Sequence, residues 1–155
     1  MSPGEQELIR RIACDVAWKA WGTFYSWGGD DPDEGFDCSG LACEILKSVG
    51  LLARQERLTA DGLTRRFASR IGLGATQIGD LVFWLDPIGK ATHVEVIIAC
   101  LTTELISMGA SGGGPHVVTR QDAIAANAFV KARPVFARGG NIALARIIQP
   151  ITGPF

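Results

Sequence analysis

The sequence predicts an α+β fold, in which helices from the N-terminal half pack on one side of an antiparallel β-sheet formed by the C-terminal half. Two observations carry this prediction. Apolar residues recur at helical spacing up to about residue 50, and short β-branched or aromatic runs separated by turn residues dominate from about residue 79 onward. Helices followed by strands, without strict alternation of the two, are typical of the α+β class.

We expect three helices in the first half of the chain. Ser2 and Glu5 have the spacing of a capping box, Pro3 occupies the first helical position, and apolar residues then share one face, so a helix is predicted over 3–20. Residues 21–35 are rich in glycine, aspartate and aromatic residues without a sustained period, which predicts a loop. A second helix is expected over 38–49, ending at Gly50, and a short third one within 59–69.

The second half predicts an antiparallel meander with strands over 79–84, 92–99 and 104–108. Residues 129–136 alternate apolar and basic side chains, so we expect a half-exposed strand near the edge of the sheet, preceded by a helical turn over 119–126. The apolar tail over 139–155 follows two glycines. We expect it to be a last strand or strap that packs on the core, or a segment that packs on a partner protein.

Composition limits the classes of function. With 155 residues and 47% hydrophobic content, the chain fits one domain over 1–155, with its core at about 5–137. A formal net charge of -1, from 15 basic and 16 acidic residues, disfavours nucleic acid and acidic membranes as partners. The four cysteines and two histidines show no zinc-ligand spacing, so no metal is expected, and we expect free thiols.

The N-terminus has no basic segment followed by an apolar core, and no stretch reaches the length of a membrane span. We therefore expect no signal peptide and no membrane span, and a protein that is cytoplasmic on synthesis.

Cys38 stands at the predicted start of the second helix, directly after Asp37. A helix N-terminus carries partial positive charge and unpaired amides, so it lowers the pKa of a thiol and can hold the oxyanion of an acyl-transfer intermediate. Cys38 is therefore the candidate nucleophile. The other three cysteines, Cys14, Cys43 and Cys100, are expected to be small buried hydrophobes.

A thiol nucleophile needs a base, and His93 is the better of the two histidines. It lies in an apolar predicted strand, where it shares a face with Glu95 and Ile97, and from there it can meet a helix N-terminus packed on that face. His116 follows three glycines and a proline in a turn, so it is the weaker candidate. A histidine in a strand can also be a hydrogen-bonded filler of the core, and spacing alone leaves both readings open.

Four short motifs occur in a characteristic order. They are Tyr-Ser-Trp-Gly-Gly at 25–29, Phe-Asp-Cys-Ser-Gly-Leu at 36–41, Gly-Asp-Leu-Val-Phe-Trp at 79–84 and Thr-His-Val at 92–94. This series resembles the NlpC/P60 family of cysteine peptidases, and the resemblance covers about residues 5 to 137. The resemblance implies a papain-like α+β fold and cleavage of bacterial cell-wall peptides, commonly between γ-D-glutamate and a diamino acid.

The resemblance also implies roles for individual residues. Cys38 is the nucleophile and His93 the general base, with no cofactor required. Tyr25, Asp37 and Ser39 match positions that bind the substrate near the free amino end of the peptidoglycan stem peptide. Asp37 and Ser39 can alternatively be caps of the helix that follows.

The chain departs from the family pattern behind the base. The family usually has glycine two residues after the histidine, whereas Glu95 stands there. It also usually has a polar group about a dozen residues downstream to orient the imidazole, where this chain has Leu105. Ser107 is the nearest polar candidate for this third catalytic position, Glu95 is a second and a backbone carbonyl a third.

The glycine-rich segment 109–114 resembles variants of the family carried by bacteriophages and prophages. With no signal peptide expected, this likeness predicts assembly into a virion tail, with tail or baseplate proteins as partners, or delivery to the cell wall by a secretion machine. Two alternatives are kept. One is a catalytically impaired structural or wall-binding component of a phage tail or secretion machine, and the other is an acyl- or amide-transferring enzyme that uses the same thiol and base.

Overall fold

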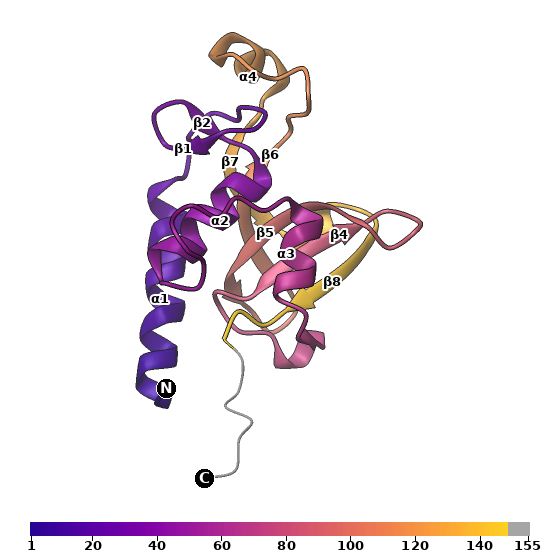
Figure 1. Ribbon diagram of the computed structural model, residues 1–155. Helices are drawn as coiled ribbons and strands as arrows, with labels where there is room; N and C mark the ends of the chain where they lie inside the picture. Colours follow the sequence, from indigo (N-terminus) through magenta and orange to yellow (C-terminus); the bar gives the residue numbers. More distant parts are fainter. Residues whose placement is uncertain (149–155) are drawn as a thin grey trace.

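The structure is a computed structural model that describes residues 1–148 (Figure 1). Its six-stranded antiparallel sheet has the order β3-β8-β4-β5-β6-β7. The strands are β3 (Arg70–Ile71), β4 (Leu81–Leu85), β5 (Ala91–Cys100), β6 (Leu105–Ser111), β7 (Phe129–Pro134) and β8 (Asn141–Ala145). Strands β4 to β7 neighbour one another in chain order, so the predicted meander is confirmed, with β7 at the sheet edge.

The helices are α1 (Pro3–Lys19), α2 (Cys38–Ser48), α3 (Ala60–Arg66) and α4 (Arg120–Ala126). Two of them begin with a capping box: Ser2 with Glu5 starts α1, and Thr119 with Asp122 starts α4. In each box the hydroxyl of the first residue accepts from a backbone N–H, and the carboxylate of the other residue accepts from the first residue's own N–H. The helix predicted over 3–20 is confirmed by α1.

Residues 21–35 were expected to be a loop, but they contain most of a short antiparallel ribbon. Strand β1 (Asp30–Asp31) pairs with β2 (Gly35–Phe36) directly before α2. Two 3₁₀ turns, η1 (Leu73–Ala75) and η2 (Val135–Ala137), complete the elements. The described part of the predicted tail contains β8, which inserts between β3 and β4, while residues 149–155 lie outside the described part of the chain.

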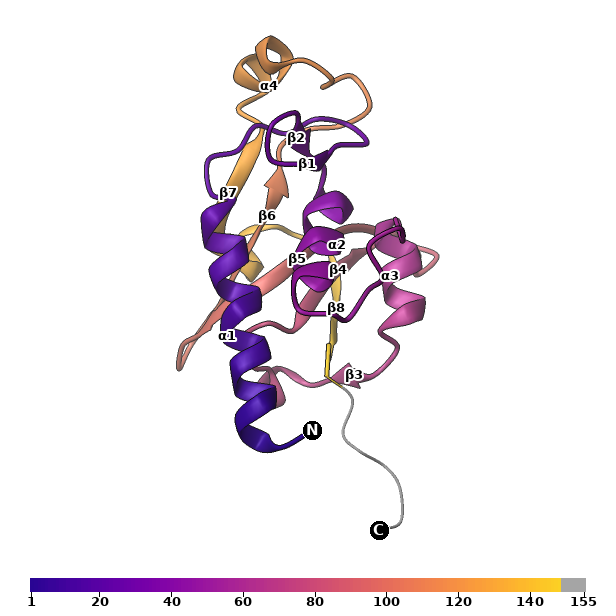
Figure 2. The ribbon, with the colours of Figure 1, turned by 60° about the vertical axis from the view of Figure 1, so that its left-hand side comes forward.

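The main core lies between one face of the sheet and α1, α2 and α3, which confirms the α+β arrangement. It is built from buried apolar residues of the helices, such as Leu41, Ile45 and Leu63, and of the strands, such as Phe83 and Val94. Figures 1 and 2 show α1 and α2 side by side against the sheet, with β6 and β7 extending upward toward α4. None of the helices in residues 1–148 is long and apolar enough to cross a membrane.

The opposite face of the sheet carries a smaller apolar cluster that includes Val82, Trp84, Ile97 and Leu144. Cys100 ends β5 close to this region and is exposed, so the expectation that it is a buried hydrophobe is wrong; Cys14 and Cys43 are buried as expected. Because a strand end has fewer neighbours than its middle, a cysteine there stays open to solvent.

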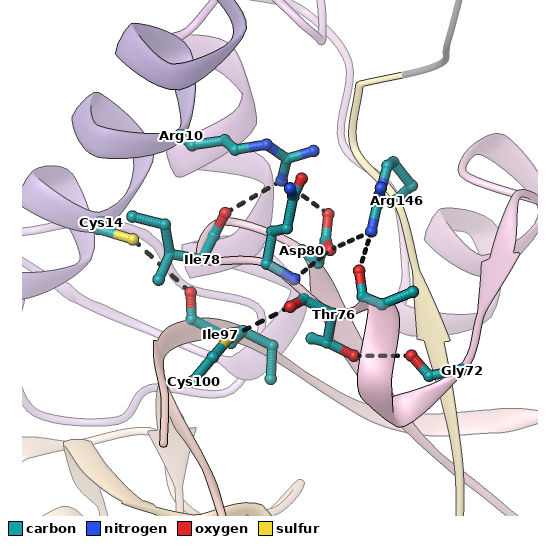
Figure 3. Close-up of polar contacts among 11 residues, drawn as sticks. Arg10, Cys14, Gly72, Thr76, Ile78, Asp80, Ile97, Cys100 and Arg146 are labelled. Carbon is teal, nitrogen blue, oxygen red and sulfur yellow. Dashed lines mark hydrogen bonds and ion pairs between the residues drawn. The ribbon is translucent and has the colours of Figure 1, made fainter. Parts of the chain in front are cut away.

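A buried ionic cluster joins three distant parts of the chain at the start of β4 (Figure 3). The fully buried Asp80 accepts from Nη1 of Arg10 on α1 at 2.9 Å and from Nη2 of Arg146, which follows β8, at 3.3 Å. The backbone N–H of Gln77 donates to the same carboxylate at 2.9 Å. The cluster therefore ties the first helix and the last strand to the sheet.

Candidate active site

Cys38 is the first residue of α2, and Asp37 fixes the start of that helix. Asp37 Oδ1 accepts from the backbone N–H of Gly40 at 2.7 Å, and Oδ2 accepts from the N–H of Gly28 at 3.0 Å. The N–H of Asp37 donates to the carbonyl of Gly29 at 3.0 Å. The Tyr-Ser-Trp-Gly-Gly motif and the cysteine motif are therefore bound together, and they present a half-buried thiol at a helix N-terminus.

His93 lies where two strands of the sheet diverge. Strand β5 pairs with β6 only from Val96 onward, opposite Met108, so the part of β5 that carries His93 has no partner on that side. The backbone N–H of Val94, which follows His93, lies close enough to the Cys38 sulfur to favour its ionised form. The divergence thus brings the start of α2 beside the strand that carries the candidate base. The helix was expected to pack on the face of His93, and this is wrong: the helix-covered core contains Val94, whereas His93 shares its face with Ile97 of the opposite cluster, so α2 meets the strand at the backbone of Val94.

A chain of hydrogen bonds extends behind the imidazole. His93 Nε2 lies 2.8 Å from Glu95 Oε1, and Ser107 Oγ donates to Glu95 Oε2 at 2.5 Å. All three side chains are buried. Ser107, the residue that the sequence placed first for the third position, is thus one hydrogen bond removed from the imidazole, and Glu95 makes the direct contact. The reason is that Glu95 follows His93 by two residues on the same face of one strand.

The protonation of these groups follows from burial and from their partners. Although burial opposes its ionisation, the hydrogen bonds with His93 and Ser107 and the charge of Arg133 lower the pKa of Glu95. An ionised Glu95 accepts a hydrogen bond from Nε2–H, which leaves Nδ1 of a neutral His93 without a proton. Burial lowers the pKa of His93, and Glu95 opposes this effect.

The thiol itself differs from the expectation. Burial raises the pKa of the Cys38 thiol to about 11, and the amides of Val94 and Ser39 only partly offset this effect. The helix start was expected to lower that pKa; desolvation outweighs it. The resting Cys38 is therefore a thiol and the resting His93 is neutral, and a nucleophile in this state needs a general base to take its proton as it reacts.

The three predicted substrate residues lie together. Tyr25, Asp37 and Ser39 line an open pocket of about 400 Å³ that also exposes Cys38, and Trp27 and Thr92 contribute further walls. Burial raises the pKa of the Tyr25 hydroxyl. The first and second motifs, far from the sheet strands in sequence, thus form one side of the pocket and the strand of His93 forms another.

Sequence reasoning missed two arginines of the site. Arg57 lines the same pocket, where Nη2 donates to Asp37 Oδ1 at 2.7 Å and Nη1 donates to Ser39 Oγ at 3.1 Å. Arg138 lies over the ring of Trp84 at 5.5 Å, and that ring is 5.3 Å from the ring of His93. Both arginines come from irregular segments without periodicity, so nothing local in the sequence indicated them.

A thiol at a capped helix start, a buried imidazole hydrogen bonded to a carboxylate, and a pocket lined by the thiol are the kinds of group from which a cysteine hydrolase site is built. The model of the NlpC/P60 family matches residues 22–132, and the chain belongs to that family.

Two characterised relatives are similar over part of their length. The bifunctional muramidase/DL-endopeptidase CwlT of Bacillus subtilis (strain 168) is 34% identical over 84 residues, which are 53% of this chain and 24% of that protein. The murein DD-endopeptidase MepH of Escherichia coli (strain K12) is 34% identical over 89 residues, 57% of this chain and 32% of that protein. The matched segment thus spans a third or less of either relative.

Solved structures agree on the fold. The NlpC/p60 domain of the peptidoglycan hydrolase SagA superposes with a TM-score of 0.58 at 25% identity, covering 88% of this chain and 98% of that one. The peptidoglycan hydrolase RipB of Mycobacterium tuberculosis gives a TM-score of 0.67 at 22% identity, covering 97% and 70%. RipD of the same organism, described as a non-catalytic NlpC/p60 domain protein, gives 0.59 at 17% identity, covering 90% and 98%.

Proposed function

We propose that the protein is a cysteine peptidase that hydrolyses peptide bonds in the stem peptides of bacterial peptidoglycan. The observation that carries this proposal is that Cys38, at the start of α2, lines a pocket beside the strand that bears His93. The imidazole of His93 is hydrogen bonded to Glu95. The family, and the endopeptidase names of both curated relatives, support a cell-wall peptide as the substrate.

The reaction follows from the protonation states of the site. His93 Nδ1 takes the proton of Cys38 as the sulfur attacks the scissile carbonyl, so the thiolate forms only when the electrophile is present. The backbone N–H of Cys38, at the open start of the helix, donates to the oxyanion. The imidazolium then protonates the leaving amine, and water releases the acyl-enzyme with His93 again acting as base.

For the bond, we propose cleavage between γ-D-glutamate and the diamino acid of the stem. The name of CwlT includes a DL-endopeptidase, whereas MepH is named a DD-endopeptidase. The choice between them draws on Tyr25, Asp37 and Ser39, which line the pocket with Cys38 and which the family resemblance assigns to the free amino end of the stem peptide. In this arrangement Arg57 fixes the Asp37 carboxylate, and the substrate ammonium shares it.

The association with a phage tail or a secretion machine is a separate proposal, which draws on the likeness of residues 109–114 to phage-borne variants. Two glycines of this segment have a local cause. A β-carbon at Gly109 would collide with Glu95, and one at Gly113 would overlap the ring of Tyr25. Packing at the site accounts for these two glycines, so tail assembly needs a test that does not depend on the likeness. Immunodetection of the chain in purified virions is that test.

The test of the activity is a muropeptide digest analysed by mass spectrometry. We expect the wild-type protein to release new amino groups at one type of bond, and Cys38→Ala to lower the rate by at least about 10³-fold because the covalent intermediate is lost. Cys100→Ala, at an exposed cysteine outside the pocket, is the matched control and keeps wild-type activity.

An unimpaired Cys38→Ala variant would refute the proposal. A wild-type protein that binds purified peptidoglycan without cleaving it would favour the non-catalytic, wall-binding alternative.

A further inference from the structure

We infer that Glu95 is the positioning residue of the catalytic base, and that it replaces, from the base's own strand, the polar group that the family usually supplies from the next strand. This inference rests on the proposed function for the role of His93 as base. The contact itself is independent of that role: His93 Nε2 lies 2.8 Å from Glu95 Oε1, and both side chains are buried.

Each oxygen of the Glu95 carboxylate has its own partner. Oε1 faces His93, and Oε2 accepts from the hydroxyl of Ser107 on β6 at 2.5 Å. Nη2 of Arg133 on β7 lies 3.9 Å from Oε1 and donates to Ser111 at the end of β6. Because both oxygens are engaged, the carboxylate cannot turn away from the imidazole without losing a buried hydrogen bond. Ser107, the polar residue of the next strand, therefore fixes Glu95 instead of contacting His93 directly.

The sheet also makes room for this side chain. Gly109 on β6 lies against Glu95, and a β-carbon there would collide with Glu95 Cγ. The family pattern has a glycine at the position of Glu95, whereas in this chain the glycine lies across from it on the neighbouring strand. Glu95 and Gly109 therefore fit against each other at the point where β5 and β6 diverge.

The charges around the pair make the carboxylate necessary for an imidazolium. Arg133 from β7 and Arg138, which follows η2, both disfavour a charged His93. The charge of Glu95 also acts on Lys131 of β7, and Arg138 is close enough for an ionised Cys38 to raise its pKa. Without Glu95, a protonated His93 would stand in a buried site with two guanidinium groups and no anion from its own strand. Glu95 is the group that offsets this repulsion.

The direct test is Glu95→Gln, which keeps the size of the side chain and removes its charge. The chain has only two histidines, so a proton NMR titration resolves His93 with His116 as an internal reference. We expect His93 to titrate at lower pH in the variant while His116 is unchanged. On stem peptides, kcat/KM should fall about 10²- to 10⁴-fold, mainly through kcat, and its acid limb should move to lower pH. Glu34→Gln, at an exposed residue of the β1–β2 turn, is the matched control.

Two readouts separate this inference from the proposed function. An unchanged His93 titration in Glu95→Gln would overturn the inference, whatever the activity. If His93 titrates at lower pH in Glu95→Gln but the wild-type protein cleaves no stem peptide, the coupling of Glu95 to His93 is supported and the peptidase activity is refuted. If Glu95→Gln does not fold, Glu95→Asp, which retains the charge at a greater distance, must still lower the pH at which His93 titrates; no shift there overturns the inference equally.

Discussion

Two buried carboxylates, Asp80 directly before β4 and Glu95 on the neighbouring strand β5, differ in what faces them. Asp80 contacts two arginines and a backbone amide, all of which keep their protonation state across the physiological pH range (Figure 3). Glu95 contacts a histidine and a serine, with Arg133 3.9 Å away, and the histidine follows Thr92, which lines the pocket that contains the Cys38 thiol. The carboxylate of Asp80 therefore makes structural ion pairs whose charges do not change, whereas the carboxylate of Glu95 is the partner of a titrating base.

The difference follows from the geometry of the strands around each carboxylate. Asp80 directly precedes β4, which is paired on both sides by β5 and β8, so its surroundings are closed. Glu95 lies on the part of β5 that has left β6, where the start of α2 enters. A closed ladder leaves room only for structural contacts, whereas a divergence of strands admits a reactive side chain from another element.

The loss of Arg10 from the Asp80 cluster should lower stability more than any other single change considered. Arg10→Met removes a guanidinium that is 4% exposed and leaves the fully buried Asp80 with a weaker set of partners. We expect the free energy of unfolding to fall by about 3 kcal/mol or more, since removing one partner strands a buried charge. Urea denaturation measures this change. Arg11→Met, at the next residue of α1, is the control, because Arg11 is 69% exposed and its pair with Glu7 contributes about 0.5 kcal/mol or less.

The comparison predicts that Arg10→Met leaves the site chemistry intact. In the folded variant, the His93 titration and the alkylation rate of Cys38 should match the wild type. A loss of stability as small as that of Arg11→Met would show that the Asp80 cluster does not stabilise the fold. A changed His93 titration would show that this cluster is not independent of the Glu95–His93 pair.

A smaller effect should appear in the dependence of stability on pH. Burial lowers the pKa of His93 below its ordinary value of 6.5, so the unfolded chain binds a proton that the folded protein resists. Stability should therefore fall as the pH drops through about 6.5, by at most about 1.4 kcal/mol per pH unit for this one proton. Glu95, whose pKa is lowered from 4.5, loses its contribution only at more acidic pH.

The measurement is a series of urea denaturations between about pH 7.5 and pH 5. His93→Gln should remove the slope in this range, because the variant carries no titrating group at the position. An equal slope in both proteins would mean that His93 is not the group responsible, and it would contradict the neutral resting imidazole on which the proposed reaction depends.

The sequence predicted the parts of the site that obey local rules. The position of Cys38 followed from a capped helix start, and the shared face of His93 and Glu95 followed from the two-residue period of a strand. Ser107 was placed on its strand, but its partner was not predictable. A β-bulge between Ile97 and Ala99 shifts the register of β5 against β6 and sets Ser107 opposite Ile97, and no local pattern reveals such a shift.

Contacts between charged residues that are distant in the sequence could not be predicted from it. Arg57, Arg133 and Arg138 are ordinary surface-type residues in the sequence, and their roles depend on which strands and turns meet at the divergence. The same holds for the protonation of Cys38. A helix start is visible in the sequence, but the desolvation that raises the thiol pKa to about 11 arises only from the folded surroundings. Local signals thus identify reactive residues, and tertiary packing determines their charge.

Removal of Arg146, the second arginine that contacts Asp80, should have a smaller effect than any of the changes above, the control Arg11→Met excepted. Arg146 contacts Asp80 at 3.3 Å, its side chain is 21% exposed, and its buried Nε has no hydrogen-bond partner among the described residues. We therefore expect Arg146→Met to lower the free energy of unfolding by only about 1 kcal/mol in the wild-type background. In the Arg10→Met background the same change should cost more, because Asp80 then loses its last arginine and both residues act on one carboxylate. A double-mutant cycle by urea denaturation measures this coupling. Strictly additive losses would mean that the two arginines stabilise the fold independently, through Ile78 and Ala75 respectively, and that Asp80 is not the group that joins α1 to the segment after β8.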